Sequence, residues 1–187
     1  LDVGAVLGHG AEVVVLATGA RPVRPSWADG SVVDATDVLC GRARPAGRVL
    51  VVDELGTQHA TSAAELLALR GCAVTTVTAA MVAAQHLSAT LDLPGWRRRA
   101  SALGIVERTD LVVQECADGR VVLLHHPTGR SSTETFDVVV HCGPAAPDDR
   151  LWHGLSGAAD VHRVGDCLAA RDAHAATTEG HRVGSRI

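Results

Sequence analysis

The stretch RVLVVDELGTQHATSAAELLALRGCAVTTVT, residues 48–78, decides the fold class of this chain. Residues 48–53 form a continuous run rich in valine, which is typical of a strand buried on both faces. Residues 61–71 have the pattern of an amphipathic helix that closes on Gly71, a residue suited to a helix end. Residues 72–78 then read as a second strand. This strand-helix-strand unit predicts two parallel strands with a right-handed crossover, and hence an α/β fold.

The first turn of this unit lacks the glycines of a dinucleotide-binding fingerprint. The pattern G-x-G-x-x-G would place glycines at Asp53, Leu55 and Gln58. Leu55 would obstruct a pyrophosphate, and the carboxylates of Asp53 and Glu54 would repel it by roughly 1 kcal/mol in water and about 4 kcal/mol at a partly buried site. Thr78 stands where an acid would bind the NAD ribose. We therefore expect a Rossmann-like scaffold that has lost ordinary NAD(P) binding, although an unusual turn that still binds a nucleotide weakly stays open.

Two other strand ends carry candidate binding residues. The stretches VVLATGA (14–20) and RVGDC (163–167) each run from an apolar strand into a glycine. Ligands of doubly wound sheets gather at the carboxyl ends of strands, and a carboxylate there can accept hydrogen bonds from ribose or ribityl hydroxyls. A helix predicted to begin near Asp172 would direct its positive end to the same region. The alternative is that both stretches only make turns. The candidate cofactor-binding residues are Ala17, Thr18, Gly19, Gly165 and Asp166.

Further elements follow from local patterns. Residues 34–39 predict a short helix, residues 93–105 a longer helix, and residues 110–126 a hairpin around an Asp-Gly turn. Residues 136–143 predict another buried strand, and residues 160–187 a strand followed by a Gly-Asp turn and a terminal helix.

Composition excludes several classes of function. A chain of 187 residues suits one domain or two small ones, and a net charge of −4 without a basic stripe argues against nucleic-acid binding. No apolar run reaches membrane-spanning length, and no signal peptide is visible. The five cysteines are scattered and form no CxxC pair, which favours reduced thiols in the cytoplasm and no metal site in this chain.

Catalytic residues are not evident. The ten histidines form no persuasive ligand set with carboxylates or cysteines, and we expect them to be at the surface or loosely packed. No residue stands out as a general acid, a general base or a nucleophile, and the serine-hydrolase pattern G-x-S-x-G is absent.

Several stretches together resemble the carboxyl-terminal half of a family of flavin and iron–sulfur oxidoreductases. This is the trimethylamine dehydrogenase, histamine dehydrogenase and 2,4-dienoyl-CoA reductase family. The most specific stretch carries a Gly-Asp turn, an Arg-Asp-Ala run and a Gly-His-Arg-Val helix in family order. The matching stretches are AEVVVLATGARP, the opening stretch, LPGWRRRASALGI, FDVVVHCGPAAPDDRLW and VGDCLAARDAHAATTEGHRVG.

The resemblance implies that this region is one of several domains, with different cofactors, in a longer polypeptide. An old-yellow-enzyme-like barrel with FMN, an iron–sulfur cluster and the first FAD motif would lie upstream of Leu1. Residues 1–46 and 130–187 would form a partial FAD- or ADP-binding domain, and residues 47–129 an inserted NAD(P)-type domain. The barrel would be the partner of this region, and an electron-carrier protein a possible second partner. The missing glycines favour the amine dehydrogenase branch, in which electrons leave to a protein carrier.

The expected function is thus the nucleotide-binding, carboxyl-terminal part of a flavin-dependent oxidoreductase, inactive on its own, with the redox chemistry in the missing cofactors. Two alternatives stay open. One is a working reductase domain that passes hydride from NAD(P)H to FAD. The other is a non-catalytic structural module that binds ADP or no nucleotide.

Overall fold

The computed structural model describes residues 2–187, which form two compact units. The split unit comprises residues 2–23 together with Pro144–Ile187, and the inserted unit comprises Arg24–Gly143. One continuous segment therefore interrupts the split unit once along the chain. The boundaries expected from the sequence, after residues 46 and 129, both fall inside the inserted unit.

The inserted unit combines a parallel sheet, an antiparallel sheet and helices. Its elements are β3 (Val33–Asp34), α2 (Ala35–Leu39), β4 (Arg48–Asp53), α3 (Gln58–Leu69), β5 (Ala73–Val77), η1 (Gln85–Ser88), α4 (Leu93–Ala102), β6 (Val106–Arg108), β7 (Leu111–Ala117), β8 (Arg120–His125), β9 (Arg130–Thr135) and β10 (Val138–Cys142).

A five-stranded parallel sheet in the order β3-β10-β4-β5-β6 forms the centre of the inserted unit. The central strand β4 is buried at every residue after Arg48, because strands and packed elements cover both of its faces. The predicted α/β fold and the two predicted strands of the opening stretch are confirmed. Helix α3 begins at Gln58, three residues earlier than the pattern indicated. Gly71 follows the helix with φ +88°, a conformation that glycine adopts without strain.

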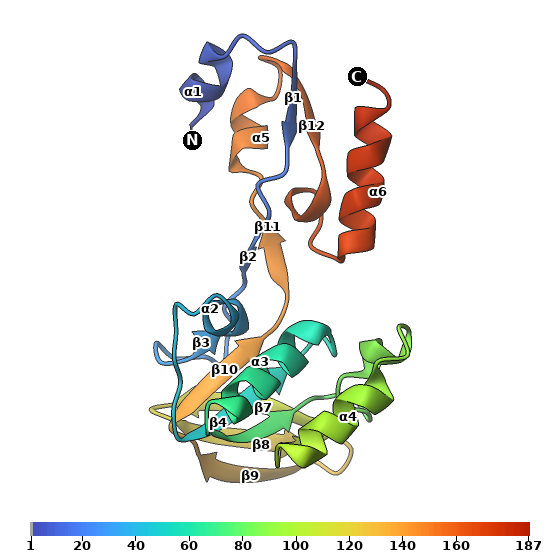
Figure 1. The fold of residues 1–187 in the computed structure, drawn as a ribbon. Helices are drawn as coiled ribbons and strands as arrows, with labels where there is room; N and C mark the ends of the chain where they lie inside the picture. Colours follow the sequence, from blue (N-terminus) through green and yellow to red (C-terminus); the bar gives the residue numbers. More distant parts are fainter. Residues whose placement is uncertain (1) are drawn as a thin grey trace. The chain divides into compact units, whose positions relative to one another are not determined.

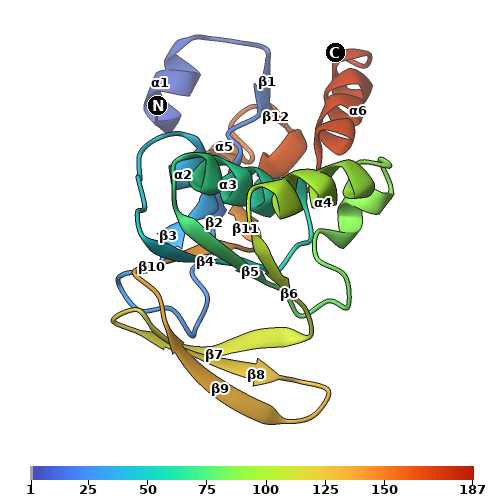
Figure 2. The ribbon, with the colours of Figure 1, turned by 60° about the horizontal axis from the view of Figure 1, so that its bottom comes forward.

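The two faces of this sheet pack against different layers. Val49 and Val51 of β4 pack with α2, α3 and α4 in one core, whereas Leu50 and Val52 pack with β7, β8 and Phe136 in a second core. Figure 2 shows the helices on one side of the sheet and the strands β7, β8 and β9 on the other. The alternation of side chains along β4 thus supplies both cores.

The antiparallel layer explains where the inserted unit ends. The predicted hairpin is present as β7 and β8, and its turn residues Asp118 and Gly119 both have positive φ. Strand β9 was not expected, because its sequence RSSTET is polar and mostly exposed. Strands β9 and β10 continue the two sheets past residue 129, and β3 joins β10 before residue 47. These pairings place both flanks in the inserted unit.

The split unit is smaller and carries two strand pairs. Its elements are α1 (Val3–Gly8), β1 (Val13–Leu16), β2 (Ala20–Pro22), β11 (Ala145–Pro147), α5 (Arg150–Leu155), β12 (Asp160–Arg163), η2 (Gly165–Cys167) and α6 (Ala173–Gly184).

Strands β1 and β12 pair in parallel, and β2 pairs with β11 in antiparallel fashion. A core that includes Leu16, Leu155, Val161 and Cys167 joins α1 and α5 to the strands. Figure 1 shows α5 and α6 on opposite sides of the β1–β12 pair. Helix α6 has no buried residue, so apolar packing holds it far less firmly than α3 in the inserted unit.

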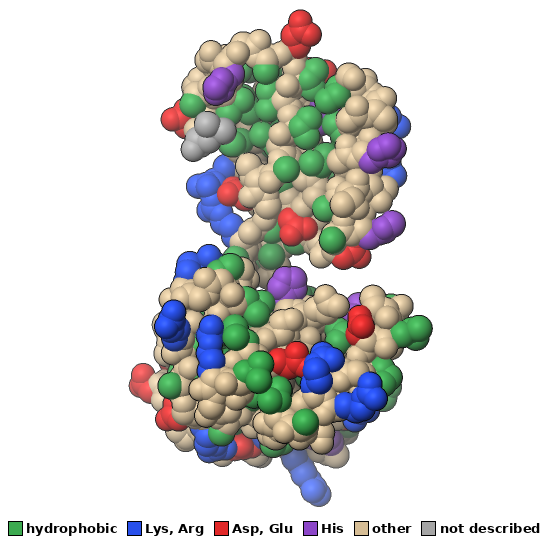
Figure 3. All heavy atoms as spheres, viewed as in Figure 1, with side chains coloured by type: hydrophobic (Ala, Val, Ile, Leu, Met, Phe, Trp, Pro, Cys, Tyr) green, Lys and Arg blue, Asp and Glu red, His purple; other side chains and the backbone are tan. Residues whose placement is uncertain are grey.

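No helix within residues 2–187 combines the length and apolar character needed to cross a membrane. On the face drawn in Figure 3, arginine side chains stand in small separate groups, with acidic side chains between some of them.

Candidate functional site

The carboxyl ends of β1 and β12 bring the predicted site residues to one edge of the split unit. The two strands are in register, with Leu16 opposite Arg163, and the amide of Val164 donates to the carbonyl of Leu16 at 3.0 Å. Ala17, Thr18 and Gly19 therefore leave β1 at the edge where Gly165 and Asp166 leave β12. The parallel pairing unites five residues that are far apart in the sequence.

Both glycines of this edge adopt backbone conformations that other residues rarely take. Gly19 has φ +80° and Gly165 has φ +65°. A Cβ atom on Gly165 would lie 3.3 Å from the Cβ of Ala176 on α6, whereas one on Gly19 would meet no atom within 4 Å. Gly19 is thus required by its conformation alone, and Gly165 also by the close approach of α6.

The hydroxyl of Thr18 is engaged within the protein. It donates to the carbonyl of Asp148 at 2.5 Å, and the amide of Asp148 in turn donates to the carbonyl of Gly19 at 2.9 Å. The thiol of Cys167 also donates to the Asp148 carbonyl, at 3.5 Å. Thr18 therefore positions the loop between β11 and α5, rather than presenting a free hydroxyl to a ligand.

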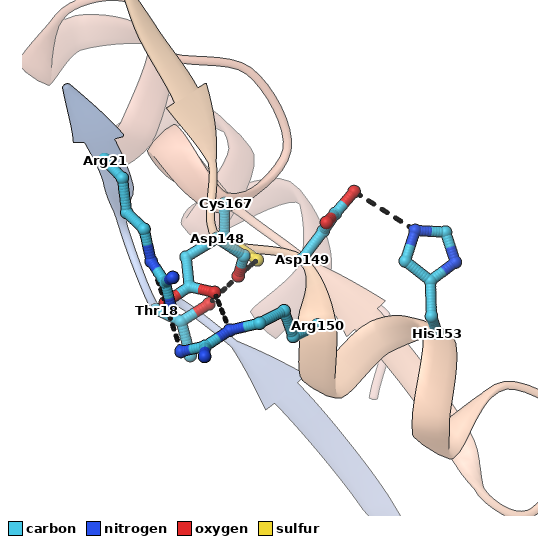
Figure 4. A network of polar contacts seen from close by, with 7 residues as sticks. All are labelled: Thr18, Arg21, Asp148, Asp149, Arg150, His153 and Cys167. Atoms are coloured by element: carbon cyan, nitrogen blue, oxygen red, sulfur yellow. Dashed lines mark hydrogen bonds and ion pairs between the residues drawn. The ribbon is translucent and has the colours of Figure 1, made fainter. Parts of the chain in front are cut away.

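Asp148 is a site residue that sequence reasoning missed. Its carboxylate pairs with Arg21 at 2.8 Å and with Arg150 at 3.0 Å, as Figure 4 shows. The guanidinium groups are well exposed, whereas the carboxylate is mostly covered. Two cations around one anion leave an excess of positive charge beside Thr18. The sequence signal was the Asp-Asp doublet that follows Pro147, a turn residue after a strand.

The second member of the doublet, Asp149, connects α5 to β12. Its carboxylate lies 3.5 Å from Arg163 and 3.3 Å from the imidazole of His153, and Arg163 stacks over the ring of Trp152. This exposed set of contacts fixes the start of α5 against the strand that ends in the Gly-Asp turn. Asp149 thus holds α5 and β12 together beside the edge where the candidate residues lie.

Asp166 is an exposed carboxylate at this edge. Its side chain is exposed, and among the described residues its recorded contact is a 3.3 Å hydrogen bond from the Arg171 amide. Helix α6 begins at Ala173, as predicted, and its N-cap Asp172 accepts from the Ala175 amide at 2.7 Å. The carboxylate of Asp166 is therefore free to accept hydrogen bonds from hydroxyls of a bound nucleotide.

Glu179 ties the Gly-Asp turn to α6. Its carboxylate accepts from the Gly165 amide at 2.8 Å and pairs with Arg171. The hydrogen bond from Arg171 is the main reason that the pKa of Glu179 lies below its usual value. The Gly165 amide, which a phosphate oxygen could have bound, is thus satisfied by the protein itself. The sequence offered no signal for this contact, because it depends on how α6 docks.

The edge fits a nucleotide in part. Exposed Asp166 suits ribose or ribityl hydroxyls, and the Arg21–Arg150 pair adds cations that suit phosphates. Against this, the Thr18 hydroxyl and the Gly165 amide already have partners in the protein. A nucleotide at this edge would be held by side chains and by Gly19, rather than by the Gly165 amide.

The β4–α3 turn of the inserted unit places its two acids apart. Asp53 is 5% exposed and accepts hydrogen bonds from the amides of Leu55 and Gly56 at 3.2 and 2.7 Å. Glu54 instead lies 3.1 Å from the imidazole of His141 and accepts from the indole of Trp27 at 3.3 Å. The expectation that both carboxylates face an incoming phosphate is wrong, since successive side chains point to opposite sides of the sheet.

His141 also corrects the expectation that the histidines are exposed or loosely packed. It is 4% exposed, and its ring meets that of Trp27 edge to face at 5.4 Å between centroids. Other histidines, such as His125 and His126, are less buried and hydrogen-bond locally. Within residues 2–187, no group of three or more histidine, cysteine or acidic side chains is arranged to hold a metal ion.

Curated proteins similar to this chain are oxidoreductases by name. A probable N-methylproline demethylase from Rhizobium meliloti is 27% identical over 96% of this chain, and an N,N-dimethylglycine/sarcosine dehydrogenase from Chromohalobacter salexigens is 26% identical over 92%. The chain spans about 31% of the length of each. No family model matches the sequence.

Solved structures agree with these relatives. The 6-hydroxypseudooxynicotine amine oxidase from Pseudomonas geniculata matches the whole chain with a TM-score of 0.91 at 28% identity, over 30% of its own length. Histamine dehydrogenase from Rhizobium sp. matches the whole chain with a TM-score of 0.90 at 25% identity, over 32% of its own length. A persulfide reductase that depends on NAD, at 19% identity and a TM-score of 0.64, shares the fold. The resemblance inferred from the sequence is thereby confirmed: the chain is similar to an N-methylproline demethylase, an N,N-dimethylglycine/sarcosine dehydrogenase and a histamine dehydrogenase, and it matches their carboxyl-terminal region.

Proposed function

We propose that this chain is the nucleotide-binding, carboxyl-terminal part of a flavin-dependent oxidoreductase that acts on amines. The observation that carries the proposal is the parallel pairing of β1 with β12, which unites Thr18–Gly19 with Gly165–Asp166 at one sheet edge. FAD or ADP would bind at this edge. The relatives, whose names are those of amine-oxidising and demethylating enzymes, support the reaction class.

In this proposal each residue of the edge has a distinct part. Asp166 accepts hydrogen bonds from ribose or ribityl hydroxyls, and Arg21 and Arg150 pair with phosphate oxygens. Ala17 and Gly19 let the backbone approach the ligand closely, while Thr18 holds the Asp148 loop in place through its hydroxyl. A bound FAD would supply electron transfer. No residue of this chain is assigned as a general acid, a general base or a nucleophile.

The rest of the enzyme is also part of the proposal. A barrel with FMN and an iron–sulfur cluster, upstream on the same polypeptide, would carry the substrate site, and an electron-carrier protein would accept the electrons. The cytoplasm is the proposed location, and nucleic acid and membrane are not proposed partners. We further propose that the present chain is inactive alone, because the substrate site and the catalytic cofactors would belong to such a barrel.

Titration of this chain with FAD and with ADP tests the proposal, by calorimetry and thermal unfolding. A ligand present at about a hundred times its dissociation constant stabilises the folded state by about 2.7 kcal/mol. Asp166→Asn removes the charged acceptor and should weaken binding by about tenfold or more, since hydrogen bonds to charged groups contribute about 1.5–3 kcal/mol. Asp160→Asn, an exposed acid at the opposite end of β12, is the matched control.

The results separate the proposal from its alternative. Binding that falls with Asp166→Asn but not with Asp160→Asn supports a nucleotide at this edge. Binding that both variants leave unchanged places the ligand elsewhere and contradicts the assignment. Should a polypeptide that includes the upstream barrel bind neither ligand, the split unit is a structural module.

The structural module remains the second candidate, and one observation favours it. The protein already satisfies two anion-binding groups near the edge, because Glu179 binds the Gly165 amide and Asp172 caps α6. A sheet edge that satisfies its own donors has less need of a ligand.

A further inference from the structure

The buried carboxylate of Asp53 stands where an α/β sheet would bind a dinucleotide. From β4 the chain continues to β5 and β6 on one side, and β10 lies on the other side of β4. This is the point where the strand order reverses, and ligands of such sheets bind outside the carboxyl ends of the strands there. Asp53 is the last residue of β4, and its side chain points to the same face as Val49 and Val51, which is the helical side.

The amides that a pyrophosphate would use are bound to this carboxylate. One oxygen of Asp53 accepts from both Leu55 and Gly56, the second and third residues after β4, in the turn through which a glycine-rich fingerprint would approach the phosphates. Burial raises the pKa of Asp53, while hydrogen bonds from the backbone of Gly56, Leu55 and Ala84 act in the opposite direction. Within residues 2–187 no arginine pairs with Asp53, so backbone amides are its main partners.

A second segment closes over the turn. Ala83, Ala84 and Leu87 are buried, and the amide of His86 donates to the carbonyl of Gly56 at 3.0 Å. Ala84 has φ +56°, an uncommon value for a residue other than glycine. A Cβ atom on Gly56 would lie only 2.9 Å from Cγ of Gln85. Residues 83–88 thus lie directly against the turn.

The space left between these parts holds one water molecule at most. The cavity beside Asp53 has a volume of about 10 Å³, close to the minimum that admits a single water. Its lining comprises Asp53, Ala60, Thr61, Thr76, Val77, Thr78, Ala83, Ala84 and Trp96. A ribose or a phosphate group is far larger than this cavity. Residues 83–88 would have to move before a dinucleotide could enter.

We propose that Asp53 is an internal anion, bound by the amides that would otherwise receive a pyrophosphate, which holds residues 83–88 over the turn and closes the inserted unit to dinucleotides. In this proposal Asp53 is the residue that excludes dinucleotides from the β4–α3 turn. The proposal concerns the inserted unit alone and stands whether or not the split unit binds FAD.

Hydrogen exchange of the whole chain, read residue by residue, tests the closure. Asp53→Ala removes the acceptor and should speed exchange at Leu55, Gly56 and residues 84–88 by roughly tenfold or more, because these amides then open locally. Asp53→Asn keeps an uncharged acceptor and should produce a smaller increase at the same amides. Glu54→Gln is the matched control, since that side chain contacts His141 and Trp27 instead. It should leave exchange at residues 84–88 unchanged.

The outcomes decide the proposal. Wild-type exchange rates at residues 84–88 in both Asp53 variants would show that Asp53 does not hold the segment, and would overturn it. If Asp53→Ala does not fold, Asp53→Asn alone decides by the same criterion. In a separate titration, millimolar inorganic pyrophosphate or NADH should not shift the amide resonances of Leu55, Gly56 and Ala84 in the wild type. A saturable shift at these amides would overturn the closure directly.

Discussion

The carboxylate of Glu179 accepts a hydrogen bond from the backbone amide of Gly165 at 2.8 Å, fourteen residues earlier in the chain. This contact joins α6 to the turn that ends β12. Since α6 has no buried residue, polar contacts of this kind carry much of its attachment. The Gly-Asp turn, which sequence reasoning took as a site for a ligand, is therefore also a docking point for the terminal helix.

Replacing Glu179 should loosen α6 without unfolding the inserted unit. Glu179→Ala removes the acceptor of the Gly165 amide and the partner of Arg171, so hydrogen exchange should rise at Gly165 and along α6. The pKa of Glu179 is lowered, so its stabilising effect is present above its ordinary pKa of 4.5 and is lost as the pH falls through its folded value. Thr178→Ala, an exposed change on the same helix, controls for helix propensity. Equal exchange in the two variants would contradict this role.

The Glu54–His141 pair should make the inserted unit more sensitive to acid. The close polar contact with His141, 3.1 Å from Nε2 to the Glu54 carboxylate, is the main cause that lowers the pKa of Glu54. A lowered carboxyl pKa contributes stability above its ordinary value of 4.5, and that stability is lost as the pH falls through the folded pKa. Glu54→Gln should therefore cost about 1 kcal/mol near pH 6, a modest value because the side chain is about a third exposed. The cost should vanish well below pH 4.5, as measured by urea unfolding at each pH.

A cost of Glu54→Gln that persists unchanged at low pH would show that packing, not charge, is responsible. Trp27→Phe is the companion change, because it removes the indole donor to Glu54 but keeps an aromatic ring beside His141. It should destabilise the protein with a weaker dependence on pH.

The cysteines should differ sharply in reactivity. Cys40 is exposed, whereas Cys72, Cys116, Cys142 and Cys167 are buried. Burial, with a smaller contribution from Asp53, raises the pKa of Cys142 to about 12, so its reactive thiolate is scarce at neutral pH. At pH 8 the native protein should give one fast modification with a thiol reagent, at Cys40, and all five after unfolding. Fast labelling of Cys142 in the native state, located by mass spectrometry, would contradict the packing at the end of β10.

Two turn glycines form a matched pair for stability measurements. Gly119 and Gly129 have φ +75° and +69°, so alanine at either position pays a left-handed strain of about 1–2 kcal/mol. At Gly119 the new Cβ would also collide with the carbonyl oxygen of Phe136, whereas at Gly129 it would meet no atom within 4 Å. Gly119→Ala should therefore be less stable than Gly129→Ala by a further ~1–3 kcal/mol. Equal midpoints in denaturant would show that the hairpin relaxes around the clash.

Much of the inserted unit could be predicted because its local patterns and its packing agree. The valine run of 48–53 is buried on both faces, and the Asp118–Gly119 turn has the backbone that a tight hairpin needs. Strand β9 was not predicted because its polar sequence has no apolar alternation, and it forms a strand by pairing with β8. The strands β2 and β11 are three residues each, too short for a periodic signal.

The candidate sites show the same limit. Ala17, Thr18, Gly19, Gly165 and Asp166 were placed at strand ends by pattern alone, and parallel pairing then brought them to one edge. The partners of these residues could not be foreseen. The Thr18 hydroxyl donates to Asp148, which lies 130 residues away in the chain. The Gly165 amide donates to Glu179, which lies 14 residues away.

By itself the sequence determined the fold class, the strand ends that carry the candidate binding residues and the absence of the glycine fingerprint at residues 53–58. These features are local, since they depend on periodicity and on the backbone freedom of single residues. Only the tertiary structure decided what the acids of that turn do. Asp53 and Glu54 are neighbours in the chain, yet the pleat of β4 sends one into the helical side and the other to His141. Burial and distant partners, which no local pattern encodes, set the role of each carboxylate.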